Sequence, residues 1–546
     1  MRQDVVAGVV LGVESVPDGL AAGLLAGVNP LAGLYAYLFG TVGGALFTSS
    51  AFMAVQATGA MAIITADVPA VQSGSDRAGA LFTLSVLTGA VMLGAGFLRL
   101  GSLLRFVSNA VMVGFISAVG VNIVLGQLPN LTGYAAEGAN RVIRALNTVV
   151  HPERLHLQSL AVGIATLVLI VVLERTRLGP MGLVLAVVGT SAVTVGIGWH
   201  DVATVSDLGA VPRSLPQPQM PLIQLVPSLL LPALSLAFVG LVQGAAISAS
   251  FPNPDGRYPD ASRDFVGQGA ANVLVGVFQG MPVGGSMSAS SLNKTAGARS
   301  RLALLVAGLV MAMVILAFAG LVGYVAMPAL AALLILIGYR TVKPAALESV
   351  WRTGAVQKAV VATTFVLTMI IPLQYAVLVG VGLAVILHVV RQSNRVTLKR
   401  WRLDGAGNLV ESDPPDRLPS NEVVALQPYG SLFFASAPAL EACLPTPTDG
   451  TRHPVVILRL RGRTDLGTSL TEILRRYAVV LAATGGKLVI VSAGERIRHQ
   501  LRVTRVTDVI GTDNIYVGDE RVGATFRRAY ADAERWIADE KAGEGA

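Results

Sequence analysis

Long apolar runs alternate with short polar loops from the start of the chain to Arg391. Runs of about 17–25 apolar residues can cross a bilayer as helices. Twelve spans are expected near residues 5–26, 31–48, 78–98, 109–127, 158–174, 181–198, 224–250, 265–279, 302–325, 327–339, 357–371 and 373–391. Two further segments, 54–69 and 286–297, are short and interrupted, and we expect half-helices there. The pattern predicts an α-helical polytopic membrane protein with 14 transmembrane segments.

Composition excludes an ordinary soluble protein. The chain is 53% apolar and 14% charged, whereas soluble domains are about 25% charged. Its net charge of +8 suits basic cytoplasmic loops, so we expect no nucleic-acid partner. The single cysteine, Cys443, excludes an intramolecular disulfide and fits a reducing compartment. No metal-ligand spacing, phosphate-binding loop or catalytic triad stands out, so the sequence predicts neither an enzyme nor a cofactor.

Positive charges predict the orientation. With a cytoplasmic N-terminus, Arg99, Lys294 and Arg340 all fall in cytoplasmic loops, and the exceptions lie in two longer external loops, 128–157 and 199–223. This bias predicts both termini in the cytoplasm of a bacterial inner-membrane protein. The first run has no small-residue cleavage site before it ends, so we expect it to be retained as a span.

The stretch 280–301, GMPVGGSMSASSLNKTAGARSR, is too polar and too rich in helix breakers for an ordinary span. Backbone that is not helical survives at membrane depth only inside protein or beside a watery cavity. A breaker-rich start followed by a short helix leaves free N–H groups at a positive dipole end. That arrangement suits an anion. The alternative is a re-entrant or cytoplasmic loop without a ligand.

The two interrupted segments occupy the third and the tenth places among the fourteen, which is the third place in each set of seven. Repeats with an odd number of spans have opposite membrane orientations. The positions therefore predict a 7+7 inverted repeat whose broken helices meet near the midplane.

The character of the chain changes after Arg391. Residues 392–420 are charged and contain Pro414, Pro415 and Pro419, which indicates a linker between a membrane domain (1–391) and a second domain (421–546). Strands are expected at 423–434, 453–462 and 486–493, and helices at 435–443, 470–483 and 524–540. We predict a small cytoplasmic α/β domain.

Several stretches resemble the sulfate-permease (SulP) anion transporters, whose animal branch includes prestin and pendrin. The resemblance rests on 16–35, 107–133 and 264–303, in order and spacing, and the C-terminal domain resembles a STAS domain. It implies core and gate domains and an anion site between the N-termini of half-helices three and ten. The first and eighth spans would close this site. It also implies a homodimer and elevator-type alternating access.

In the tenth segment, Ser286, Ser288 and Ser290 are candidate hydroxyl ligands, with backbone N–H groups from Gly285 to Ala289. Prestin-like members have an arginine that falls on Ala289. Without that cation, dipole ends and hydroxyls hold the anion alone, which argues against tight binding of a doubly charged anion unless a cation enters with it.

In the third segment, Ala57 replaces the proline that is usual in the family, and Gln56 replaces a small residue. Gln56 can donate two hydrogen bonds and Thr58 one. Either can face the anion; the alternative is that both satisfy neighbouring backbone.

Two acidic residues depart from the family pattern. Glu14 and Asp18 lie four residues apart on one face of the first span, and Asp18 falls where the family usually has a glutamine. In the eighth span, Gln243 falls where many members have a glutamate. A carboxyl inside the bilayer is a functional hypothesis by default, so either acid can bind a proton or help to hold Na⁺. Pro17 would free carbonyls for a cation. The alternative is that Glu14 lies near the interface and pairs with a basic loop residue.

In the STAS-like domain, the stretch from Thr464 to Ser469 stands where related bacterial domains have a phosphorylated serine turn. The order of residues is altered, which favours a packing and dimerisation role over phosphoregulation.

Together these features predict a secondary active transporter of small anions such as sulfate, bicarbonate or a dicarboxylate, coupled to H⁺ or Na⁺. The alternatives are an anion exchanger, an uncoupled anion channel, a nucleobase transporter and a sensory protein that reports anion occupancy.

Overall fold

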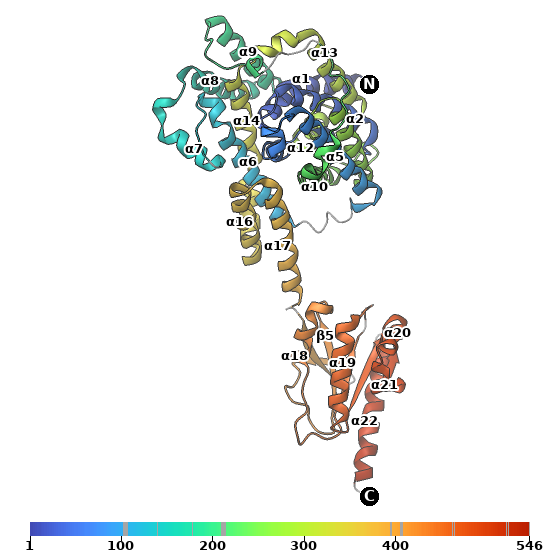
Figure 1. The fold of residues 1–546 in the computed structure, drawn as a ribbon. Helices are drawn as coiled ribbons and strands as arrows, with labels where there is room; N and C mark the ends of the chain where they lie inside the picture. The colour runs from blue at the N-terminus through green and yellow to red at the C-terminus, as the bar shows by residue number, and fades with distance from the viewer. Residues whose placement is uncertain are drawn as a thin grey trace. The chain divides into compact units, whose positions relative to one another are not determined.

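The computed structural model describes residues 1–101, 108–138, 140–176, 178–208, 214–393, 396–404, 408–460, 462–463, 465–519, 521 and 523–544. Thr464 of the predicted turn lies outside these residues. The chain forms two compact units, Met1–Ala384 and Val385–Ala546 (Figure 1). Each unit is described by itself.

The first unit is helical. Its helices are α1 (Arg2–Leu25), α2 (Pro30–Phe47), α3 (Gly59–Ala66), α4 (Pro69–Ser73), α5 (Arg77–Phe97), α6 (Asn109–Thr132), α7 (Arg141–Val150), α8 (Leu157–Glu174), α9 (Met181–Ile197), α10 (Val226–Ser250), α11 (Ala261–Val277), α12 (Met287–Thr295), α13 (Leu302–Gly323), α14 (Met327–Thr341), α15 (Pro344–Thr353), α16 (Ala355–Ile370) and α17 (Leu373–Ser393). Each of the fourteen predicted segments has its helix. Among the described residues, seven helices are long and apolar enough to cross a membrane, and three shorter apolar helices accompany them.

Three helices lie outside the predicted segments. They are α4, α15 and α7, which begins where the Asn140 side chain accepts the Ile143 N–H (2.9 Å). In α7, Ile143, Leu146 and Val149 are exposed, while Ala145 is buried. Helix α7 lies within the stretch 128–157, which was expected to be an external loop.

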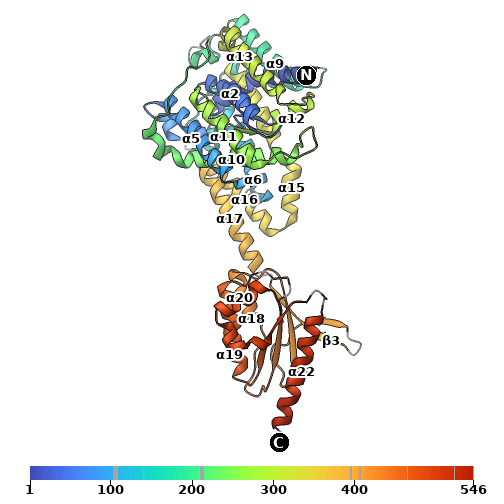
Figure 2. The ribbon, with the colours of Figure 1, turned by 90° about the vertical axis from the view of Figure 1, so that its right-hand side faces the viewer.

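The helices of the first unit pack as two groups. In the core group, α1 packs on α2 and α13, and α11 packs on α2 and α5, with α10 against α5. In the gate group, α6 packs on α14 and α16, and α8 packs on α9 and α14. In Figure 1, α8, α14 and α6 of the gate group lie to the left of α2, α5 and α10 of the core group. Figure 2 shows α10 and α11 of the core group beside α5. The core group thus combines predicted segments 1–4 with segments 8–11, and the gate group consists of segments from 5–7 and 12–14. This division is the one expected for the inverted repeat.

The second unit contains a six-stranded sheet in the order β4-β3-β5-β6-β7-β8. Its strands are β3 (Thr397–Leu403), β4 (Leu409–Ser412), β5 (Val423–Tyr429), β6 (Val455–Arg459), β7 (Lys487–Ala493) and β8 (Ile515–Val517). Strands β5 to β8 are parallel, whereas β3 and β4 are antiparallel to their neighbours. The predicted linker 392–420 is therefore corrected, because β3 and β4 belong to the sheet.

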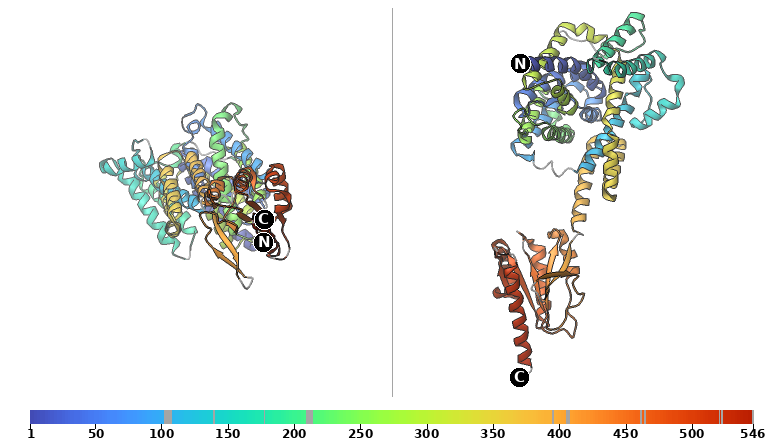
Figure 3. Two further views of the ribbon diagram at one scale, coloured as in Figure 1. Left: turned by 90° about the horizontal axis from the view of Figure 1, so that it is seen from below. Right: turned by 180° about the vertical axis from the view of Figure 1, so that it is seen from behind.

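Helices cover both faces of this sheet, which explains the continuous apolar runs of its strands. Val424 and Leu426 of β5 pack with the face that carries α18 (Ala437–Cys443), α19 (Gly467–Ala482), α20 (Glu495–Val503) and α21 (Val506–Ile510). Val423 and Ala425 pack on the other face, against Phe526 of α22 (Ala524–Glu544). Figure 3 shows α22 in red along the sheet.

The stretch predicted to correspond to a phosphorylated turn leads into α19. Hydrogen bonds from the Gln500 side chain (2.6 Å) and the Gly467 N–H (2.9 Å) lower the pKa of Asp465. Because Gln500 belongs to α20, its bond joins the turn to that helix.

Candidate functional site

Two short strands join the interrupted segments of the two repeats. β1 (Ala54–Gln56) pairs antiparallel with β2 (Gly284–Ser286), so that Ala54 faces Ser286 and Gln56 faces Gly284. Half-helix α3 follows β1, and half-helix α12 follows β2. Because the strands are antiparallel, the two helices leave the pair in opposite senses and their N-termini both lie at it. The sequence predicted the half-helices but not these strands.

The N-terminus of α12 is capped by its own serine. Ser286 is the N-cap residue, and its hydroxyl accepts the Ala289 N–H (3.4 Å) and lies 3.2 Å from the Ser288 hydroxyl. The first N–H groups of a helix have no partner within it. Ser286 is buried and Ser288 is exposed, which makes Ser288 the accessible hydroxyl of this half-helix.

Two amides on α11 fix the backbone that leads into α12. Asn272 accepts the Val283 N–H (2.9 Å) and donates to the Val283 carbonyl (2.7 Å), which is a strand-like pairing made by a side chain. Gln268 accepts the Gly285 N–H (2.9 Å). The Gly285 N–H, which we predicted to face the anion, is therefore engaged within the protein.

Asp264, Gln268 and Asn272 are fully buried and follow one another at intervals of four residues on α11. Asp264 accepts hydrogen bonds from the Ser49 N–H (2.6 Å) and the Ser248 hydroxyl (2.5 Å). Sequence reasoning missed these three positions, although their spacing on one helical face is a readable signal.

Close backbone contact explains the glycines of β2. A Cβ on Gly284 would lie 2.8 Å from the Gly240 Cα, and a Cβ on Gly285 would lie 2.8 Å from the Gly244 Cα. Both partners belong to α10, the eighth span. Helix α10 therefore lies directly against the strand that begins the tenth segment.

Thr58 caps α3 and links it to the eighth span. Its hydroxyl donates to the Gln243 Oε1 (2.9 Å) and lies 3.4 Å from the Met61 N–H. Both side chains are partly exposed. Ala57 is buried, and its carbonyl accepts the Tyr37 hydroxyl (3.1 Å). Thr58 and Gln243, which we predicted separately, are thus brought together.

Gln56 and Ser290 have internal roles. The Gln56 amide donates to the Ser15 hydroxyl (2.9 Å) and the Thr41 hydroxyl (3.2 Å), so neither of its two hydrogens is free. The Ser290 hydroxyl donates to the Ser286 carbonyl (2.6 Å) and accepts the Ala54 N–H (3.0 Å). The expectation that these side chains face an anion is corrected, because both are fully buried and bonded.

Ala289, at the position of the arginine in prestin-like proteins, packs its methyl group with Ala54, Leu11 and Leu304. This half-helix therefore carries no cation at that position.

The acidic pair lies on α1, which faces the β1–β2 pair through the Ser15–Gln56 bond. Helix α1 is continuous through Pro17, so the expected local break is absent from this described helix. Asp18 Oδ1 is buried without a hydrogen-bond partner among the described residues. An unpaired buried carboxylate oxygen fits a bound proton or a monovalent cation.

Glu14 lies four residues before Asp18 on α1, so the two carboxyls share one face of this helix. The basic partner that we considered for Glu14 is absent from the ion pairs of the described residues. Among these residues, no group of three His, Cys, Asp or Glu side chains is arranged to hold a metal ion.

The fold and this site define a multi-pass membrane transporter built from inverted repeats with paired half-helices. Comparison with protein families agrees: the sulfate permease family matches residues 1–364, and the STAS domain matches residues 417–518. Because the first match covers more than half of the chain, the chain belongs to the sulfate permease family. It is a transporter rather than an enzyme.

Individual proteins support the assignment. The putative sulfate transporter YvdB of Bacillus subtilis (strain 168) is 25% identical over 521 residues, covering 94% of this chain and 96% of that protein. The murine Solute Carrier 26 family member A9 anion transporter, in an inward-facing state, matches with a TM-score of 0.84 and 17% identity, covering 97% of this chain and 92% of that chain.

The transmembrane domain of a cyanobacterium bicarbonate transporter, BicA, matches with a TM-score of 0.60 and 22% identity, covering 70% of this chain and 97% of that chain. At these identities the two structures show a shared fold.

Proposed function

We propose that the chain is a secondary active transporter of small anions such as sulfate, bicarbonate or a dicarboxylate. The observation that supports this most is the meeting of two half-helix N-termini at the β1–β2 pair, with Ser288 and Thr58 at accessible positions. N–H groups and positive dipole ends favour an anion. YvdB is described as a putative sulfate transporter and BicA as a bicarbonate transporter, which supports these two anions as the first to test.

The contacts divide the eight predicted binding residues into two kinds. Ser288 and Thr58, with the first N–H groups of α12, are the groups that would touch the anion, while Ser286 would cap α12 through the Ala289 N–H. Gln56, Ala57, Gly285 and Ser290 would hold the backbone in place, because their polar groups are bonded within the protein.

Transport would follow from movement of the core group against the gate group. Both half-helices belong to the core group, so an anion held at their N-termini would travel with it. This is the elevator-type alternating access that we expect for the fold. A homodimer, an inner-membrane location and cytoplasmic termini complete the proposal, and the positive charges of the predicted cytoplasmic loops support the orientation.

Coupling would come from Asp18, with Glu14 one turn away. The proposed site has no fixed cation, and the unpaired carboxylate of Asp18 nearby would repel an anion. A proton or Na⁺ on Asp18 would remove the repulsion and let the anion bind. Gln243, which is neutral and bonded to Thr58, would orient the site rather than carry a coupling ion.

Uptake of labelled sulfate, bicarbonate and succinate into proteoliposomes with imposed pH and Na⁺ gradients tests this proposal. We expect uptake to saturate, to follow one of the two gradients and to lose that dependence in Asp18→Asn. Saturable flux that ignores both gradients would instead support an exchanger, large single-channel currents a channel, and competition by uracil or xanthine a nucleobase transporter.

A further inference from the structure

An ion pair joins the core group to the gate group, to which α7 belongs because it packs on α6. The Arg141 guanidinium, at the start of α7, donates to the Asp67 carboxylate at the end of α3 (2.8 Å). The side chains are only 18% and 19% exposed. Because α3 is the half-helix that carries Thr58, this bond ties one side of the candidate anion site to the gate group.

The position of Asp67 is unusual for helix stability. Asp67 is the C-cap residue of α3, and a negative charge at a helix C-terminus opposes the helix dipole. A cation beside the carboxylate offsets this unfavourable interaction, and the Arg141 guanidinium is such a cation. The Arg141 side chain runs along α6, since a Cβ on Gly126 would make an ordinary van der Waals contact of 3.5 Å with the Arg141 Cδ.

Helix α3 also makes apolar contact with the gate group. Helix α3 packs on α6, where a Cβ on Gly59 would lie 2.6 Å from the Ile123 Cδ1. Such a contact can slide, whereas an ion pair of 2.8 Å is lost after a shift of a few ångströms. The ion pair between Asp67 and Arg141 is therefore the contact at this boundary that is present in one arrangement of the two groups and lost in another.

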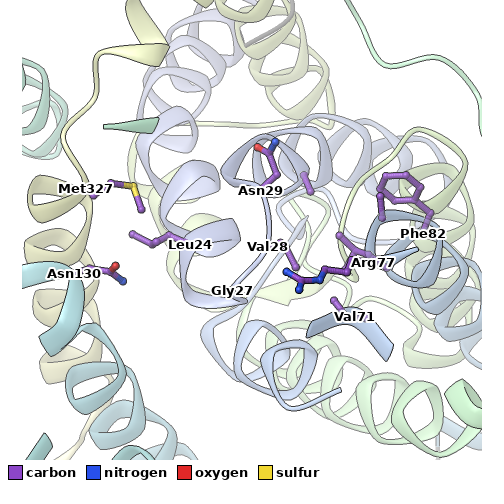
Figure 4. A pocket seen from close by; sticks show the side chains of 12 residues that line it. Leu24, Gly27, Val28, Asn29, Val71, Arg77, Phe82, Asn130 and Met327 are labelled. Atoms are coloured by element: carbon purple, nitrogen blue, oxygen red, sulfur yellow. The ribbon is translucent and has the colours of Figure 1, made fainter. Parts of the chain in front are cut away.

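The same boundary holds a cavity of about 440 Å³ (Figure 4). Val71 and Arg77 line it from the core group, and Asn130 and Met327 line it from the gate group. It lies beside the end of α1, where Leu24 and Gly27 line it, and there the Gln72 amide on α4 donates to the Ala26 carbonyl (2.9 Å). The packing of the two groups therefore leaves space at this part of the boundary.

We propose that Asp67 and Arg141 form a latch that holds α3 against the gate group and must open for the core group to move. The inference rests on the proposed alternating access. The bond exists only when the groups are docked as here, so it biases the conformational equilibrium by its own free energy. Neutralising either residue favours the alternative arrangement by roughly two- to tenfold.

The test uses Asp67→Asn, Arg141→Gln, the double variant and the charge swap Asp67→Arg/Arg141→Asp in the full chain. Arg144→Gln is the matched control, because Arg144 lies three residues further along α7. We expect the single variants to change the initial rate of anion uptake, the double variant to add little to either, and the swap to restore part of the change. Equal effects of Arg144→Gln and Arg141→Gln, or strictly additive single variants, would overturn the latch.

A second experiment separates the latch from the proposed function. Cysteines replace Asp67 and Arg141 in a Cys443→Ser background, since Cys443 is the only cysteine in the chain, and a reducible bifunctional thiol reagent joins them. We expect cross-linked protein to stop transporting and to recover after reduction. Full uptake by cross-linked protein would refute the latch. If the unmodified protein transports no anion, the proposed function fails. The bond between Asp67 and Arg141 can then still be tested by comparing the loss of unfolding free energy in the double variant with the sum of the losses in the two single variants.

Discussion

The two half-helices share one backbone plan but differ in what their side chains do. Each follows a three-residue strand and begins at a hydroxyl cap, Thr58 for α3 and Ser286 for α12. Helix α3 is apolar, with six of its eight residues buried, and its end is bonded to the gate group through Asp67. Helix α12 is rich in serine, and Lys294 near its end lies over the rings of Phe251 (4.9 Å) and Phe52 (5.7 Å) within the core group.

This difference separates two tasks that the inverted repeat places at one site. In the proposed site, α12 would offer a hydroxyl to the anion, and its start is held by the buried amides of α11. Helix α3 would offer its N-terminus, and its other end carries Asp67, which is bonded to the gate group. The inverted repeat therefore accounts for the backbone that the two half-helices share, and the different side chains of the two repeats account for the different proposed roles of α3 and α12.

The largest expected effect comes from the amide that anchors β2. Asn272→Leu leaves the buried N–H and carbonyl of Val283 without their partner, which costs roughly 3 kcal/mol of unfolding free energy. Thermal unfolding in detergent measures this loss. Asn122→Leu is the matched control, because buried Asn122 makes one bond, to the Thr368 carbonyl (2.9 Å). If both variants lose the same unfolding free energy, the strand-like pairing of Asn272 with Val283 contributes no more than the bond of Asn122.

Added methyl groups should distinguish the two segments next. In Gly285→Ala the new Cβ meets the α10 backbone, and overpacking of this kind costs about 1–3 kcal/mol. In Gly59→Ala it meets the end of the flexible Ile123 side chain, so we expect little change. Parallel melting curves of the two variants check this. Equal tolerance would mean that β2 and α10 can move apart.

The two caps should be closer in effect. Ser286→Ala and Thr58→Val each remove a cap, which costs about 1 kcal/mol. Thr58→Val also breaks the bond to Gln243, so its loss should be the larger and should be restored by Thr58→Ser. Thermal unfolding of the three variants measures the order. A larger loss for Ser286→Ala would contradict the role of Gln243.

The smallest stability effect is expected at Ser288. This hydroxyl is exposed, so Ser288→Ala should leave unfolding nearly unchanged. If it contacts the anion, losing one hydrogen bond to a charged group raises KM about tenfold. Uptake kinetics over a range of anion concentrations decide this. An unchanged KM would remove Ser288 from the site.

Most of the fold followed from the sequence because apolar length and helix breakers are local signals. The fourteen segments, the half-helices and the α/β domain were all predicted in this way. Strands β3 and β4 were missed because their charged residues, such as Lys399 and Arg400, face partners that only the folded sheet supplies. The β1–β2 pair joins residues more than 200 positions apart, so no local pattern reveals it.

The site was predicted less completely, because a polar side chain near an anion site can equally serve the protein. Gln56 and Ser290 were sound choices by residue type, yet their partners come from α1, α2 and β1. Asn272 lies in an apolar span and was not predicted as a residue of the site. Only the three-dimensional structure shows whether a polar side chain is available to a ligand or is already hydrogen-bonded within the protein.

The central claim is that an anion binds where the two half-helices begin. Thermal unfolding of the purified protein with sulfate, bicarbonate or succinate, with and without Na⁺ and at two pH values, tests it most directly. An anion at a hundred times its Kd adds about 2.7 kcal/mol. We expect this stabilisation in the natural protein and in Ser291→Ala, and its loss in Ser286→Ala/Ser288→Ala. Equal stabilisation of all three proteins would place the anion elsewhere and contradict the account.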